Sequence, residues 1–317
     1  MPIMRTICTC TGLLGLLIGC AAETSNDTNA LGSNQQGIID GKLACDPALD
    51  AVAAVVFRYA PYEYEEFYCS ATLIGPRVAL TARHCVTGDS GWHFEPDPDF
   101  KNYLVFGKSY DAPKQEVRIT GFTAAPAGPG GLLGDGGRDM AVLYLEEAPK
   151  KIKPAKLGLF KESMLGTQFR IAGFGWTEDF TSGTKYEGVA TARALEGDWY
   201  PLLFDGDYEA YDEWYWTDSA LAAPSAEEEA LWWAPGTYTL EPGYELLVGG
   251  LPGESVSCYG DSGGPLLLGK AAKKMTIYGV SFAGEASLSK ACGQGSGYAV
   301  LNEEMLDFVE DAVDAAP

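Results

Sequence analysis

The chain has only two histidines, His84 and His93, among its 317 residues. They lie in unrelated local sequences and do not form the ligand pattern of a zinc-dependent hydrolase. The chain is acidic enough to bind calcium, but it lacks the ligand spacing of an EF-hand loop. We therefore predict no metal centre and no cofactor.

Basic residues are also scarce, with 22 Lys and Arg against 44 Asp and Glu, which gives a formal net charge of -22. Such a charge argues against binding to nucleic acid or to an anionic membrane surface. The sequence has no internal repeat that would indicate a solenoid or an array.

The longest apolar run lies at the N-terminus, where one basic residue precedes a stretch ending in Leu16-Leu17-Ile18-Gly19-Cys20. Residues 1–20 are typical of a secretory signal and are too short to span a membrane. The ending also resembles a bacterial lipobox, in which Cys20 would be acylated; the alternative is an ordinary signal that contains a cysteine. Residues 21–37 are polar and predict a disordered tether or propeptide. We expect an exported bacterial protein, either secreted or anchored as a lipoprotein.

Short apolar or alternating runs separated by Gly and Pro follow, and they predict an all-β fold. The first set comprises 51–59, 67–74, 78–81, 103–106, 115–119 and 140–145, and the second comprises 168–172, 237–240, 244–248, 265–268, 275–282 and 297–300. Residues 146–158 read as a linker between the sets. Asn302 is placed to cap a final helix with Met305, Leu306, Val309 and Val313 on one face.

An acidic and aromatic segment at about 198–233 interrupts the second set. It contains Trp199, Trp214 and Trp216 among many carboxylates. One interpretation is a surface loop whose aromatic side chains pack on the strands. The other is an exosite for a protein substrate or a cell-surface component, which would leave those side chains exposed.

The segment Gly260-Asp261-Ser262-Gly263-Gly264-Pro265 contains the most informative candidate residue, Ser262. A serine hydroxyl needs an adjacent base to act as a nucleophile at neutral pH. His84, in Thr81-Ala82-Arg83-His84-Cys85, is the candidate base, and His93 is expected at the surface. Asp139 precedes an apolar strand and can orient the base, whereas Asp135 lies in a Gly-rich loop without a following strand.

The order His84, Asp139, Ser262, with these flanking sequences, resembles the trypsin/chymotrypsin family of serine proteases from Ile38 to the C-terminus. Ile38-Ile39-Asp40-Gly41 looks like that family's mature N-terminus, and Gly173-Phe174-Gly175 and Ser281-Phe282-Ala283 are similar to two of its internal segments. The resemblance implies a monomeric protease domain over 38–317. It also implies two six-stranded antiparallel β-barrels, at about 38–150 and 159–300, and a C-terminal α-helix.

The resemblance also assigns roles. Ser262 would attack the substrate carbonyl, His84 would carry the proton, and Asp139 would hold the imidazole. The N–H groups of Gly260 and Ser262 would form the oxyanion hole, and Ser281 would hydrogen-bond Asp139.

Disulfides Cys69–Cys85 and Cys258–Cys292 are implied as well, which suits an oxidising compartment. Cys45 has no obvious partner in the sequence, so it is either a buried thiol or the remnant of a lost bridge.

Val256 lies six residues before Ser262, at the family's position for the base of the primary specificity pocket. Trypsin-like enzymes carry an aspartate there, which pairs with Arg or Lys. Burying a cation beside valine would leave it unpaired. Ala283 and Ser296 look like the pocket walls and Ser281 belongs to the same lining, so we predict cleavage after small or medium apolar residues.

In the family, a new N-terminal ammonium at the Ile38 position pairs with the aspartate before the nucleophile, here Asp261. Gly37 precedes Ile38, so an activating protease would not be one specific for Arg or Lys. If Cys20 is acylated and Cys45 has no partner, this cut would also release the domain from its membrane. Two departures from the family pattern are Arg83, beside the base, and Asp40, in place of a glycine.

The sequence thus predicts an exported serine endopeptidase, made as a zymogen, that acts on proteins or peptides. The alternative is a catalytically silent homologue that binds partners through the segment at 198–233.

Overall fold

The computed structural model describes residues 38–60, 64–87, 94, 99–128, 137–216, 236–269, 275–285 and 292–316. The predicted signal, the tether, Cys20, His93, Asp135 and residues 217–235 lie outside the described residues. Within the described part, no helix has the length and apolar character that crossing a bilayer requires.

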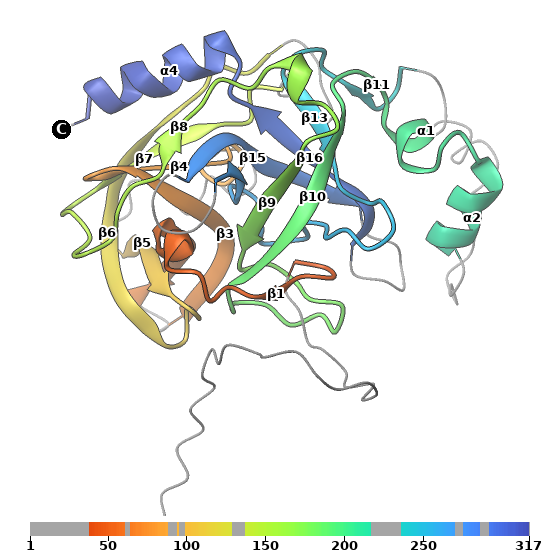
Figure 1. Cartoon of the computed structure of the whole chain (residues 1–317). Coiled ribbons are helices and arrows are strands. Elements are labelled where there is room, and N and C mark those ends of the chain that lie inside the picture. Colours follow the sequence, from red (N-terminus) through yellow and green to blue (C-terminus); the bar gives the residue numbers. More distant parts are fainter. Residues whose placement is uncertain are drawn as a thin grey trace, which may run out of the picture. The chain divides into compact units, whose positions relative to one another are not determined.

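Six antiparallel strands close into a first barrel, in the order β2-β3-β4-β7-β6-β5 (Figure 1). Their bounds are β2 Val52–Tyr59, β3 Tyr64–Gly75, β4 Val78–Thr81, β5 Phe100–Gly107, β6 Pro113–Ala124 and β7 Ala141–Leu145. Alternate residues such as Ala53 and Val55 of β2 fill the interior together with Leu104 and Leu143. The intervening residues Val52, Ala54 and Val56 are also buried, because they face the second barrel.

A second closed ring of six antiparallel strands runs β9-β10-β13-β16-β15-β14 and back to β9. Its strands are β9 Gln168–Gly173, β10 Tyr186–Ala194, β13 Glu245–Val248, β14 Pro265–Leu268, β15 Thr276–Glu285 and β16 Gly293–Val300. Two short strands join it: β1 (Lys42–Leu43) pairs with β10, and β8 (Lys156–Leu157) runs parallel to β15. The two-barrel prediction is therefore confirmed.

Most strands lie where the apolar runs predicted them, but β10 was not predicted. Its buried face carries the small residues Ala190 and Ala192, whereas Val189 is exposed. The hydrophobic contrast along this strand is thus weak and partly inverted, and it gives little periodic signal.

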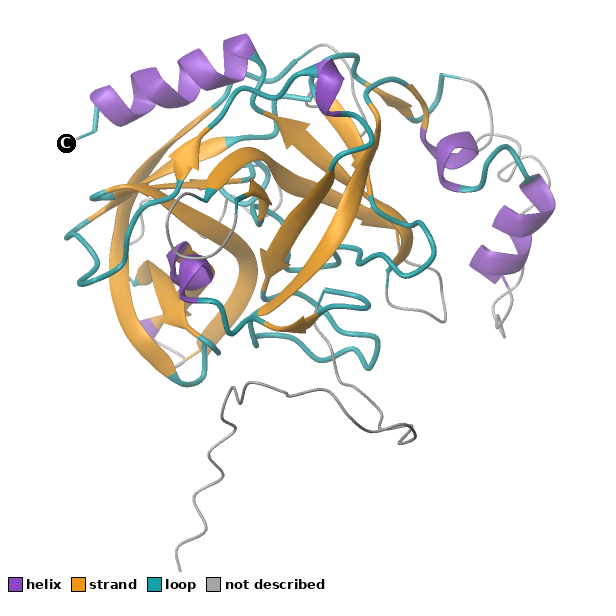
Figure 2. Ribbon diagram, in the orientation of Figure 1, coloured by secondary structure: helices purple, strands orange, loops and turns teal. Residues whose placement is uncertain are grey.

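The predicted C-terminal helix is α4 (Glu303–Asp314). The side chain of Asn302 caps it by accepting a hydrogen bond from the Met305 amide at 2.9 Å. Met305, Val309 and Ala312 are buried in the core cluster that joins the two barrels. Among the described residues, the other regular elements are the 3-10 turns η1 (Pro47–Ala51) and η4 (Glu162–Met164), the helices α1 (Trp199–Leu203) and α2 (Tyr208–Trp216), and the strand pair β11 (Gly197–Asp198) and β12 (Thr239–Leu240). Figure 2 shows the helices in purple and the strands in orange.

Candidate active site

His84 and Asp139 come from the two segments that flank the β4–β7 pair of the first barrel. Nδ1 of His84 lies 2.7 Å from Oδ2 of Asp139, and the backbone amide of His84 donates to Oδ1 at 2.9 Å. Asp139 is 2 % exposed because it directly precedes the buried start of β7. A carboxylate at Nδ1 places the ring proton there and leaves Nε2 as the basic nitrogen.

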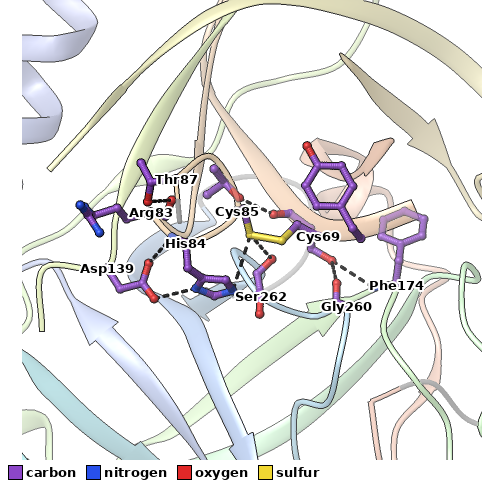
Figure 3. The surroundings of a disulfide bond; sticks show 12 residues. Cys69, Arg83, His84, Cys85, Thr87, Asp139, Phe174, Gly260 and Ser262 are labelled. Carbon is purple, nitrogen blue, oxygen red and sulfur yellow. Dashed lines mark hydrogen bonds and ion pairs between the residues drawn. A yellow bond between two sulfur atoms is a disulfide. The ribbon is translucent and has the colours of Figure 1, made fainter. Parts of the chain in front are cut away.

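Ser262 lies in the turn that leads into β14, and Figure 3 shows it beside the ring of His84. Ser70 of β3 holds this turn from the first barrel. Its amide donates to the carbonyl of Ser262 at 2.7 Å, and its hydroxyl donates to the carbonyl of Gly260 at 3.0 Å. The same hydroxyl accepts from the amide of Phe174 at 3.2 Å. Sequence analysis missed Ser70; its place directly after Cys69 was the only signal.

The amides of Gly260 and Ser262 donate no hydrogen bond to any described residue, whereas the amide of Asp261 between them donates to Cys258 at 2.9 Å. Gly260 has φ of 90°. A Cβ there would lie 2.8 Å from the ring of Phe67. Only glycine fits this position, and the turn leaves two neighbouring N–H groups able to stabilise an oxyanion.

Asp261 is fully buried, and its carboxylate accepts hydrogen bonds from the amides of Gly175 at 2.8 Å and Cys258 at 2.9 Å. A Cβ on Gly175 would lie 2.5 Å from Cγ of Asp261, so the glycine makes room for the carboxylate. Burial raises the pKa of Asp261 to about 7, and the two amide hydrogen bonds oppose that rise. Within the described residues this carboxylate has no basic partner.

The segment that begins at Ile38 enters the second barrel. Ile38 is fully buried in the barrel core, and Ile39 pairs with Val256 as an isolated antiparallel bridge. The amide of Asp40 hydrogen-bonds the carboxylate of Glu178. The segment predicted to form a new N-terminus thus pairs with Val256, five residues before Asp261 in the chain.

The predicted pocket residues come together on β15, β16 and the segment before Ser262. Val256 is buried with Ile39, Cys258 and Cys292, and Ala283 pairs with Gly297 across the β15–β16 ladder. Ser296 is buried, and its hydroxyl accepts from the amide of Ser257 at 2.8 Å.

Two further hydroxyls in this region were not predicted. Those of Ser257 and Tyr298 are both buried and hydrogen-bond each other. Ser281, which the resemblance pairs with Asp139, is buried on β15. Its backbone joins Gly263 and Gly264 at 2.7 and 2.8 Å. Ser281 thus connects β15 to the turn that carries Ser262, and it forms no hydrogen bond with Asp139 among the described residues.

Both implied disulfides are present, Cys69–Cys85 and Cys258–Cys292. The sulfurs of Cys69 and Cys85 lie close to the ring of His84 but are bonded to each other, so they are not thiolate ligands for a metal.

The structure corrects the expectation for Cys45 and shows a contact that Arg83 makes. Cys45 is exposed and disulfide-bonded, so both interpretations, a buried thiol and the remnant of a lost bridge, are wrong. The predicted release of the domain by cleavage alone rested on an unpaired Cys45 and loses that basis. Arg83 donates from Nε to the carbonyl of Ala125 at 3.0 Å.

The described part of the acidic and aromatic segment packs on the second barrel. Trp199, Tyr211 and Trp214 are buried in one cluster with Leu247 of β13. Nε1 of Trp199 donates to the carboxylate of Glu285 at 3.3 Å, and burial raises the pKa of Glu285 to about 7. For these residues the packing interpretation is supported; the side chain of Trp216 and residues 217–235 lie outside the described part.

A family model described as trypsin matches residues 39–193. Among solved structures, the one described as GrC is 17% identical with a TM-score of 0.55, covering 87% of this chain and all of that one. Mouse neuropsin, described as a serine protease expressed in the limbic system of the brain, is also 17% identical with a TM-score of 0.55, covering 86% of this chain and 99% of that one. At that identity, the two structures bear on the fold alone. Together, the family match over residues 39–193 and the two closed barrels identify a trypsin-like serine endopeptidase.

Proposed function

We propose that this peptidase cleaves peptide bonds through His84, Asp139 and Ser262. The observation that carries the proposal is the 2.7 Å contact between His84 and Asp139, beside a turn in which the amides of Gly260 and Ser262 donate to none of the described residues. Oγ of Ser262 attacks the scissile carbonyl carbon while its proton passes to Nε2 of His84. The carbonyl oxygen becomes an oxyanion that accepts hydrogen bonds from the amides of Gly260 and Ser262.

Collapse of this intermediate breaks the C–N bond as His84 returns the proton to the leaving amine. Water then attacks the acyl-enzyme, with His84 again as base, and regenerates Ser262 with release of the acid. Oδ2 of Asp139 holds the imidazole at Nδ1, while Oδ1 accepts a hydrogen bond from the backbone amide of His84.

The substrate side chain before the scissile bond is small or medium and apolar. Val256 offers no charge at the pocket base, and the nearby hydroxyls of Ser257, Ser296 and Tyr298 are engaged with one another or with backbone. A basic side chain would bury an unpaired cation there, at a cost of roughly several kcal/mol.

The chain is made as a zymogen that is cut before Ile38. The new ammonium would supply the cation that the buried carboxylate of Asp261 lacks among the described residues. Ile38 has φ of 58° in the uncut chain, a backbone conformation that β-branched residues rarely adopt. Cutting removes the preceding peptide unit and with it this constraint. Because Gly37 precedes the bond, the activating protease has a specificity other than Arg or Lys.

The enzyme is exported, as its two internal disulfides suit. Acylation at Cys20 would anchor it to a bacterial membrane, and a mature mass without lipid would instead indicate a secreted form.

Digestion of a diverse peptide mixture, with the products identified by mass spectrometry, tests the proposed activity. We expect cuts after apolar residues by the chain cut before Ile38, and none by matched Ser262→Ala and His84→Ala variants. Equal cutting by the variants would reject the assigned roles. A folded wild type without activity would favour the silent binding homologue.

A further inference from the structure

Three exposed aromatic side chains gather next to the oxyanion turn. Trp176, Phe180 and Tyr259 are 37%, 52% and 56% exposed. The ring of Trp176 lies 5.7 Å from that of Phe180 and 5.1 Å from that of Tyr259, both edge-on. We call these three residues the aromatic platform. Exposed apolar side chains scattered singly are ordinary, but a contiguous group of rings marks an interaction site.

The platform is fixed to the catalytic turn by backbone contacts. Tyr259 directly precedes Gly260, and the amide of Trp176 donates to the carbonyl of Tyr259 at 2.8 Å. Trp176 also follows Gly175, whose amide donates to the carboxylate of Asp261. The rings are therefore held in a set position relative to the oxyanion donors.

Phe180 reaches the solvent from an unfavourable backbone conformation, with φ of 57°. The turn is held by hydrogen bonds between Thr177 and Thr181 and from the amide of Phe180 to the carbonyl of Thr177, at 2.7 to 3.0 Å. Glycine would adopt this conformation without strain. An aromatic residue that is strained and half exposed points to a role in binding rather than in packing.

The order of strands shows which part of a substrate the platform meets. The turn with Ser262 leads into β14, which pairs with β15 on one side and β9 on the other. The pocket walls Ala283 and Ser296 lie on β15 and β16, whereas Trp176 and Phe180 lie in the connection from β9 to β10. A peptide with its acyl part at the pocket therefore extends its leaving part across the β9 side.

We propose that the aromatic platform binds a large apolar or aromatic side chain within the first two residues after the scissile bond. This inference rests on the proposed peptidase function and adds a specificity determinant to it. Glu178 and Asp179 are exposed in the same turn, so acidic side chains at these substrate positions are disfavoured.

The test compares two kinds of substrate with the same acyl part. Quenched fluorescent peptides vary the first and second residues after the scissile bond among Phe, Leu, Ala and Glu. A p-nitroanilide substrate has no amino acid there at all. Trp176→Ala should lower kcat/KM for the Phe and Leu peptides by about tenfold and leave anilide hydrolysis unchanged.

Phe180→Gly is a second variant. Glycine removes the ring and adopts the positive φ without strain, so we expect this variant to fold. Leu251→Ala is the matched control, since Leu251 is 41% exposed and does not belong to the platform. The control should cut all substrates as the wild type does.

Loss of the Phe and Leu preference in both platform variants, with anilide hydrolysis intact, supports the inference. An unchanged preference, or an equal fall for the anilide, overturns it. A dimer that dissociates in Trp176→Ala also overturns it, because the rings would then bind a second copy. Wild type that neither hydrolyses the anilide nor reacts with a fluorophosphonate would overturn the proposed function itself.

Discussion

The backbone amide of Ile39 donates to the carbonyl of Val256 at 2.9 Å, and the amide of Val256 donates back to Ile39 at 3.1 Å. This pairing joins the segment next to the predicted cut to Val256, the predicted base of the substrate pocket. The predicted pocket and the predicted activation segment are therefore connected through this backbone bridge.

The charge at position 256 should decide the preference for the residue before the scissile bond. Val256→Asp places a carboxylate where a basic substrate side chain would end, so the ratio of kcat/KM for Arg over Leu substrates should rise by at least about 100-fold. Chromogenic peptides that differ only in this residue provide the measurement. Val256→Asn is the control for polarity without charge and should gain no activity towards Arg. Preferred cleavage after Arg or Lys by the wild type would contradict the assignment of the pocket.

Asp261 should make the uncut chain less stable as the pH rises. Its pKa is raised from 3.8 to about 7 in the folded state, so the folded chain retains a proton that the unfolded chain loses. The associated stability is complete below about pH 4 and is lost as the pH rises through 7, on the order of 4 kcal/mol in all. Urea unfolding at pH 5 and pH 8, in an uncut Ser262→Ala background, measures the difference.

Two comparisons isolate this effect from other titrating groups, including Glu285, whose raised pKa acts in the same direction. Asp261→Asn should reduce the difference between pH 5 and pH 8. Cutting before Ile38 should reduce it as well, because an ammonium beside the carboxylate lowers its pKa. If the uncut chain, the Asp261→Asn variant and the cut chain all showed the same pH dependence of unfolding free energy, the proposed pairing of the new ammonium with Asp261 would be contradicted.

Part of the candidate site could be predicted from the sequence because short segments of the chain identify its residues. Ser262 has a distinctive glycine setting, only two histidines compete for the role of base, and Asp139 precedes a clear apolar strand. The strand runs likewise located most of both barrels. Asn302 gave the start of the last helix.

The rest depends on contacts between distant segments. Ser70 meets Gly260 only because one barrel packs on the other, and Trp176 meets Tyr259 only through a turn between strands. Ala190 and Ala192 of β10 are buried and Val189 is exposed, so no periodic hydrophobic pattern indicated this strand. Such contacts between distant segments cannot be predicted from the local sequence alone.

Ser70 should act by positioning the oxyanion turn. Ser70→Ala leaves the carbonyl of Gly260 and the amide of Phe174 without this partner, at about 1–3 kcal/mol in unfolding free energy. We also expect a fall in kcat with little change in KM for an anilide substrate. Thr72→Val is a matched control on β3, because the buried hydroxyl of Thr72 has no hydrogen-bond partner within the described residues. A loss of kcat in the control equal to that of Ser70→Ala would contradict this role.

The carboxylate of Asp139 should determine the tautomer of His84. Asp139→Asn keeps the size of the side chain but no longer favours the proton on Nδ1. We expect kcat to fall by about 10⁴-fold, the loss known for this substitution in trypsin-like enzymes. Single-turnover acylation at pH 7 gives the rate. A loss below tenfold would mean that the 2.7 Å contact does not orient the base.

The central claim is that Ser262 becomes a reactive nucleophile in the chain that starts at Ile38. Its most direct test is the intact mass of cut and uncut chains after treatment with a fluorophosphonate probe. The account predicts a single adduct on the cut wild type, mapped to Ser262, slower labelling of the uncut chain, and none on Ser262→Ala. A folded, cut wild type that gains no adduct would contradict it.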